Sequence, residues 1–171
     1  ANSLSISLNA RPVEFSPAAQ ARALLAGARS SLAVAAMAGR TKERWTRAAF
    51  MLSEPQGLIV LDRVSTGESG ALDVSSRWLA LGQPQSAGAS GYSAIQENGG
   101  VAAAFFQSAE VRAGAAGEAT LQAWNGFPGA ARGLAEWSAR WSSAIAIGES
   151  LYFRAVFAPV RAGSPAAIRA A

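Results

Sequence analysis

The side chains that most often carry catalysis are scarce in this sequence. Its 171 residues include no histidine and no cysteine, which excludes Ser-His and Cys-His nucleophiles, an imidazole base and thiolate metal ligands. The aspartates are Asp62 and Asp73, and Asp62 beside Arg63 at a predicted strand end is more typical of an ion-pair or turn residue than of a general acid. These residue types identify no catalytic residue, and we expect no cofactor and no metal site.

Aromatic side chains leave two narrower alternatives. Tyr92 and Tyr152 are candidates for an acid or base in elimination chemistry, although a single tyrosine within a strand is usually packed. Tryptophan rings can stack against the apolar faces of sugars, but the spacing of four of them within predicted strands favours packing in the core. These four are Trp78, Trp124, Trp137 and Trp141.

The basic side chains are dispersed along the chain. Fifteen basic residues, of which only Lys42 is a lysine, face eleven acidic ones and give a net charge of +4. The excess of arginine over lysine indicates codon bias. The arginines run from Arg11 to Arg169 without the basic cluster that nucleic-acid binding needs. A dispersed set still suits an acidic polysaccharide, because the planar guanidinium matches carboxylates and sulfates. We therefore expect no nucleic-acid partner and keep an acidic polysaccharide as a candidate partner.

Length and composition fit a single domain. Half of the residues are hydrophobic and 15% are charged, which excludes a disordered chain, and the apolar runs are too interrupted to span a membrane. We predict one β-sandwich domain over residues 1–160 and an Ala-rich tail over residues 161–171. The sequence starts directly in a strand-like alternation at Leu4, Ile6 and Leu8, without an initiator Met or a signal core, which indicates a processed or excised piece of a longer protein.

Alternating apolar and polar residues predict strands along most of the chain. Ala18–Met37 suits a helix by propensity, but the extended pattern after it favours two strands joined through Gly27. Gly57–Val64 is the clearest strand, and we expect Leu58 to Val64 to be central and buried. Further alternating segments are 72–80, 101–107, 110–113, 119–124, 137–147 and 151–157, and we predict a hairpin from the last two. The predicted fold class is all-β, a two-sheet antiparallel β-sandwich of about a dozen short strands.

The same alternation predicts which side chains face the core. We expect nine large apolar residues to be mostly buried: Leu4, Ile6, Ile59, Leu61, Trp78, Phe105, Trp141, Phe153 and Phe157.

Three segments together resemble a known family. They are Ala1-Asn2-Ser3-Leu4-Ser5-Ile6, then Arg44–Leu52, then Leu58-Ile59-Val60-Leu61-Asp62-Arg63-Val64. Their order and approximate spacing resemble the C-terminal β-sandwich region of the heparinase II/III-like polysaccharide lyases, and the likeness continues loosely through Trp78 to the hydrophobic segment around Leu151 to Pro159. Where that family places a catalytic histidine this sequence has Ala1, and the family's helical toroid is absent.

The resemblance implies a β-sandwich domain that supports or contacts an acidic glycan and is not catalytic alone. It implies Asn2, Arg44 and Arg47 as substrate-binding residues, a missing N-terminal helical region or partner chain, and an exported bacterial protein that is periplasmic or secreted. The alternative is a structural or adhesive β-sandwich module of an exported bacterial protein without a sugar site. A third alternative is an intact enzyme that works through Tyr92, Tyr152 or carboxylates.

Overall fold

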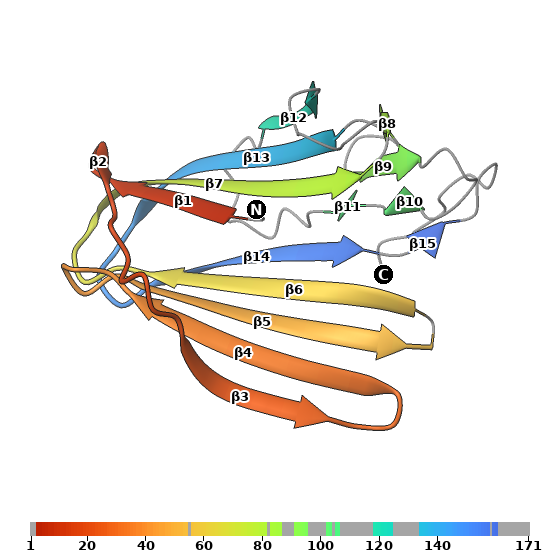
Figure 1. Cartoon of the computed structure of the whole chain (residues 1–171). Coiled ribbons are helices and arrows are strands. Elements are labelled where there is room, and N and C mark those ends of the chain that lie inside the picture. Colours follow the sequence, from red (N-terminus) through yellow and green to blue (C-terminus); the bar gives the residue numbers. More distant parts are fainter. Residues whose placement is uncertain are drawn as a thin grey trace.

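Most of the described strands form two antiparallel sheets, which pack face to face at one end of the larger sheet (Figure 1). The computed structural model describes residues 3–54, 56–81, 83–86, 91–95, 102–103, 105–106, 118–124, 134–157 and 159–160, with side chains for 4–54, 56–78 and 141–157. None of these residues forms a helix long and apolar enough to cross a membrane.

The smaller sheet has the strand order β12-β13-β7-β1-β2, and the larger sheet has the order β3-β4-β5-β6-β14-β11-β9-β8. Strands β10 and β15 form a separate pair. The strands are β1 (Ser3–Leu8), β2 (Arg11–Pro12), β3 (Gln20–Ala26), β4 (Ser30–Ala38), β5 (Arg44–Ser53), β6 (Gln56–Ser65), β7 (Gly70–Leu81), β8 (Gln83–Ser86), β9 (Gly91–Ile95), β10 (Ala102–Ala103), β11 (Phe105–Phe106), β12 (Glu118–Trp124), β13 (Leu134–Ile145), β14 (Ser150–Phe157) and β15 (Pro159–Val160).

The predicted class, an all-β antiparallel sandwich, is confirmed. Nine of the described strands have six residues or more, where the sequence predicted about a dozen strands. The Ala-rich stretch is two strands, β3 and β4, and the backbone N–H of Gly27 donates to the Ser30 carbonyl at 2.8 Å in the turn between them. Pairing with β5 on the far side of β4 places this stretch in a sheet, so tertiary context overrides the helix propensity of alanine.

The core lies between β1, β7 and β13 of the smaller sheet and β6 and β14 of the larger one. Trp141 packs against Phe153 across the two sheets with ring centroids 4.4 Å apart, and Trp78 packs against Phe157 at 4.6 Å. The buried apolar residues are Leu4, Ile6, Leu8, Val60, Val64, Leu72, Val74, Trp78, Trp141, Ile145, Phe153 and Ala155. Inward residues therefore alternate along each strand, as the sequence pattern predicted for β1, β7 and β14.

In β6 the predicted inward face is wrong. Ile59 and Leu61 are half-buried on the outward face, whereas Val60 and Val64 are 3% and 0% exposed. Asp62 faces inward with these two valines, and a one-residue shift moves every side chain of a strand to the other face. Leu4, Ile6, Trp78, Trp141 and Phe153 are buried as predicted, and Phe157 is half-buried, while the side chain of Phe105 lies outside the described residues.

The predicted hairpin between the last two long strands is also wrong. Strand β13 pairs with β7 and β12, and β14 pairs with β6 in the other sheet, so the connection at 146–149 crosses between the sheets. Gly148 has a φ of +81° there, and the Glu149 N–H donates to the Ala146 carbonyl at 3.1 Å. The tight turn was recognised correctly, but it joins two strands whose inward side chains face one another.

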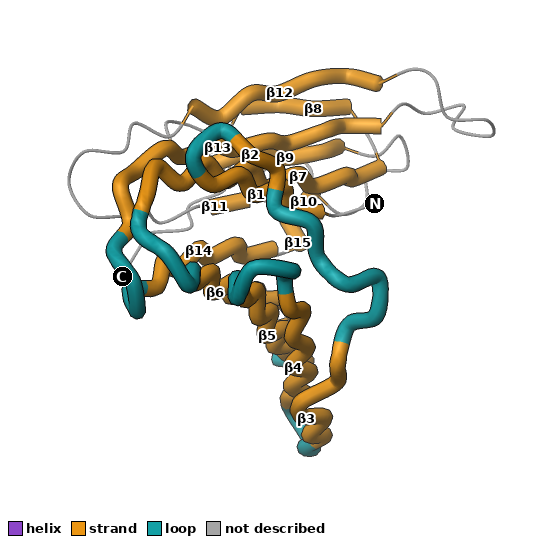
Figure 2. Tube along the Cα trace, turned by 90° about the vertical axis from the view of Figure 1, so that its left-hand side faces the viewer, coloured by secondary structure: helices purple, strands orange, loops and turns teal. Residues whose placement is uncertain are grey.

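Strands β3, β4 and β5 extend away from the smaller sheet, as Figure 2 shows. Strand β3 is an edge strand, and the large apolar side chains of this extension are uncovered: Leu24 is 79% exposed, Leu25 62% and Met51 60%. Residues 13–19 cross from β2 to β3 along this part of the molecule, and Phe15 meets the Trp45 ring edge-on at 5.9 Å.

Replacing Asn9 by alanine is expected to lower the free energy of unfolding by about 1–2 kcal/mol. Asn9 has a φ of 52° in the turn after β1, a conformation that asparagine tolerates better than alanine. Its Oδ1 also accepts the Ala71 N–H at 2.9 Å. Urea unfolding of Asn9→Ala measures this loss of stability. Asn9→Asp serves as control, because aspartate keeps an oxygen that accepts the Ala71 N–H and also tolerates a positive φ. Equal losses in the two variants would contradict this account.

Candidate functional site

Four side chains form a polar cluster between the sheets. Arg47 on β5 and Asp62 on β6 are opposite each other in the strand pairing, and the guanidinium donates from Nε to Oδ1 at 2.8 Å and from Nη2 to Oδ2 at 2.9 Å. The indole Nε1 of Trp45 donates to the same Oδ1 at 2.7 Å. The Arg47 guanidinium lies 5.0 Å from the Trp45 ring and 4.9 Å from the Trp78 ring.

This cluster joins the two sheets. Trp78 belongs to β7 of the smaller sheet, so the cation between two indole rings connects β5 and β6 to the opposite layer. Asp62 is 3% exposed and has three donors, and the side chain of Arg47 is 22% exposed. The prediction of an ion-pair role for Asp62 is confirmed, although its partner is Arg47 and its place is within β6 rather than at a strand end.

The predicted binding residues are not brought together. Arg44 and Arg47 are three residues apart on one strand, so their side chains point to opposite faces of the sheet. Arg44 is exposed on the outward face, while the carboxylate-binding edge of Arg47 is occupied by Asp62. Asn2 lies outside the described residues. Glycan contact by these three residues stays a prediction.

The outward face of β5, β6 and β14 is basic. We call it the arginine face and define it by Arg44, Thr46, Arg63, Ser65, Ser150, Tyr152 and Arg154. The three arginines and Tyr152 are exposed. The Arg63 Nε donates to the Ser150 Oγ at 3.0 Å, and its guanidinium lies 5.9 Å from the Tyr152 ring. This side of the sheet therefore presents cations, hydroxyls and one aromatic ring to solvent.

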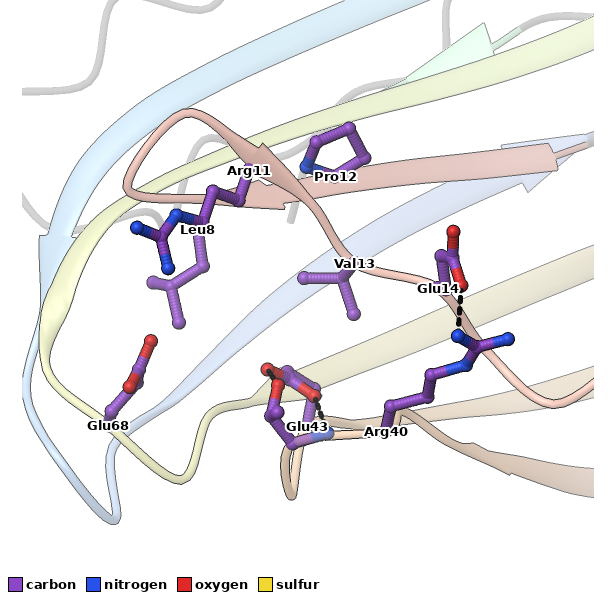
Figure 3. A pocket seen from close by; sticks show the side chains of 9 residues that line it. Leu8, Arg11, Pro12, Val13, Glu14, Arg40, Glu43 and Glu68 are labelled. Carbon is purple, nitrogen blue, oxygen red and sulfur yellow. Dashed lines mark hydrogen bonds and ion pairs between the residues drawn. The ribbon is translucent and has the colours of Figure 1, made fainter.

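A second candidate is a pocket at the loop end of the molecule (Figure 3). Its volume is about 340 Å³, and it lies between the β1–β2 hairpin, the β4–β5 loop and the β6–β7 loop. Arg40 pairs with Glu14 at 3.0 Å, and Glu43, which is 3% exposed, accepts the Thr41 N–H at 3.0 Å and the Thr41 hydroxyl at 2.5 Å. The lining residues are Leu8, Arg11, Pro12, Val13, Glu14, Arg40, Thr41, Glu43 and Glu68.

The charges of this pocket do not favour an acidic ligand. Three glutamates and two arginines line it, and one of these arginines is already paired with a glutamate. Among the residues whose side chains are described, no group of three acidic side chains is arranged to hold a metal ion. The arginine face is the better candidate for a polyanion, because the charged residues at its outward positions are all arginines.

Of the two tyrosines proposed as alternative catalytic groups, Tyr152 has a described side chain. Tyr152 is 56% exposed on the arginine face. The backbone of Tyr92 lies in β9 opposite Phe105, and its side chain is outside the described residues. The described geometry thus offers Tyr152 to a ligand on the sheet surface rather than within a cleft.

The fold and this face together define a two-sheet antiparallel β-sandwich with a cationic outer surface. No protein-family profile and no curated protein sequence matches the chain. Solved structures do match it. A mutant of heparan sulfate lyase HepC from Pedobacter heparinus aligns with a TM-score of 0.65 at 10% identity, over 93% of this chain and 24% of that one.

Two further matches have the same character. The structure of heparinase III aligns with a TM-score of 0.65 at 14% sequence identity, over 91% of this chain and 23% of that one. A second heparinase III gene product aligns with a TM-score of 0.65 at 11% identity, also over 91% of this chain and 23% of that one. The resemblance to the heparinase II/III-like β-sandwich is confirmed at the level of the fold. The chain spans about a quarter of the length of these structures.

Arg63 and Arg154 are the residues of the arginine face that sequence reasoning missed. The alternation of side chains along a strand already places Arg44 and Arg47 on opposite faces of the sheet. The sequence alone could therefore have shown that Arg44 does not share a face with Arg47. The neighbourhood of Arg63 and Arg154 depends on the pairing of β6 with β14, whose residues follow about 90 positions later, and no local pattern predicts that pairing.

Proposed function

We propose that this chain is the β-sandwich domain of a heparinase II/III-like polysaccharide lyase, that it supports the catalytic part of that protein, and that it contacts an acidic glycan. The observation that carries the proposal is the alignment of 91–93% of the chain with 23–24% of heparan sulfate lyase and heparinase III structures. The basic outward face, with Arg44 on it, supports the glycan contact. In this proposal the parent protein is exported, because its polymeric substrate lies outside the cell.

In the proposal the domain is not catalytic alone. β-Elimination requires a base that removes the proton next to the carboxylate carbon and a group that neutralises the carboxylate. An arginine supplies the second function, since its fork matches the carboxylate. The usual base is missing, because the chain contains no histidine.

The 171-residue chain is expected to show no turnover of heparin, alginate or hyaluronan. The measurement is the ultraviolet absorbance of the unsaturated product during incubation with each polymer, with an intact heparinase as positive control. Turnover that disappears in Tyr152→Phe would contradict the proposal and identify Tyr152 as the base. Turnover that survives this substitution would assign the base elsewhere and equally contradict the claim of incompleteness.

A further inference from the structure

We infer that the arginine face binds a linear acidic glycan along a diagonal from Arg44 through Arg63 to Arg154. This inference deepens the proposed function and rests on it for the choice of a glycan as ligand. It assigns the contact to the outward side of the larger sheet, opposite the side that faces the core, and not to the pocket of Figure 3.

The strand pairing aligns the three arginines. Arg63 lies opposite Thr46 of β5, and Arg44 is two residues from Thr46 on the same strand. Arg63 also lies opposite Tyr152 of β14, and Arg154 is two residues from Tyr152 in the other direction. Each step is therefore a diagonal neighbour contact of about 7–8 Å, and the two steps continue in one direction. A row of separate cations at regular intervals suits a polymer whose anionic groups repeat along its length.

The described outward positions of these strands carry one kind of charge. Outward positions alternate along β4, β5, β6 and β14, and among these described positions the arginines are the only charged residues. The others are Ser30, Leu32, Val34, Ala36, Ala38, Thr46, Ala48, Phe50, Leu52, Gly57, Ile59, Leu61, Ser65, Ser150, Tyr152 and Val156.

The uncharged members of the face fit a sugar polymer. Thr46, Ser65 and Ser150 are half-buried on it and can donate to or accept from sugar hydroxyls. Tyr152 is 56% exposed beside Arg63 and offers a ring for an apolar sugar face.

The shape of the surface favours a glycan over nucleic acid. Single-stranded nucleic acid is usually held in a continuous basic groove with successive stacking rings, and duplex DNA is read by elements that enter a groove. The arginine face is the surface of a sheet with three separate cations and one exposed ring on it. An extended glycan with spaced carboxylates or sulfates matches these features better.

The test compares two triple variants with equal loss of charge. In the face variant Arg44, Arg63 and Arg154 are replaced by glutamine, and in the control variant the exposed Arg11, Arg22 and Arg29 are replaced by glutamine. Binding of a size-defined heparin oligosaccharide is measured at low and at near-physiological ionic strength, and circular dichroism checks that both variants are folded. An exposed ion pair changes affinity by up to about fivefold, so we expect the face variant to bind at least about tenfold more weakly and the control variant to stay within about threefold.

Each other outcome contradicts a distinct claim. Equal losses in both variants would show that net charge rather than this face binds heparin, and a loss confined to the control variant, which includes Arg11, would direct attention to the pocket. Equal affinity of the wild type for inorganic polyphosphate, unchanged in Tyr152→Ala, would overturn the assignment to a glycan. Absence of heparin binding by the wild type at low ionic strength would overturn the glycan contact of the proposed function itself.

Discussion

Replacing Phe153 by alanine is expected to lower the free energy of unfolding by about 3–5 kcal/mol, the range for a buried aromatic side chain. Phe153 is 4% exposed and its ring centroid lies 4.4 Å from that of Trp141 in the opposite sheet. The truncation leaves a cavity at the centre of the contact between the sheets. For a chain of this size the melting temperature should fall by roughly 6–20 °C, at 2–4 °C for each kcal/mol.

Tyr152→Ala is the matched control for this measurement. Tyr152 precedes Phe153 on the same strand and is 56% exposed on the opposite face, so its removal should change stability by no more than about 0.5 kcal/mol. Both variants are unfolded in urea and followed by tryptophan fluorescence and circular dichroism. A stable Phe153→Ala protein together with a destabilised Tyr152→Ala protein would reverse the assignment of the faces of β14.

The fold class was predictable because alternation is a local property of the sequence. In β7 polar residues separate Leu72, Val74 and Trp78, and all three are buried. In β6 all four residues of Leu58–Leu61 are apolar, so alternation does not show which two of them face the core. The choice of Ile59 and Leu61 as inward residues was wrong, because Asp62 faces inward with partners that come from another strand.

The connection between β13 and β14 shows a second limit of local patterns. A tight turn at 146–149 between two alternating segments is consistent with a hairpin, but the same turn also joins strands of two facing sheets. A hairpin would place both strands in one sheet. The observed crossing packs the Trp141 ring against the Phe153 ring across the core, with centroids 4.4 Å apart and ring planes inclined at 52°.

Of the candidate site, the sequence predicted Arg44 but not its neighbours. The neighbours come from strands whose order in the sheet, β5-β6-β14, skips the whole segment from β7 to β13. Such long-range pairing is set by the packing of both sheets together. Arg47 was predicted to bind substrate, yet its environment is dominated by Asp62 and two indole rings.

Replacing Asp62 by alanine is expected to destabilise the fold by about 3–5 kcal/mol, as when one partner of a buried ion pair is removed. The variant leaves the Arg47 guanidinium without a counter-charge between two indole rings, and it leaves the Trp45 Nε1 without its acceptor. Arg47→Met should also be destabilising, because it leaves Asp62, which is 3% exposed, with the indole donor alone.

The double variant Asp62→Leu/Arg47→Met distinguishes a coupled pair from two independent packing residues. Apolar replacement of both partners removes the cost of burying two charges, so the double variant should lose less stability than Asp62→Ala alone. Urea unfolding of the singles and the double gives the coupling energy. Raising the ionic strength should change it little, because salt screens a buried pair weakly. Strictly additive losses would contradict the coupling and would leave Arg47 free to exchange Asp62 for an anionic ligand.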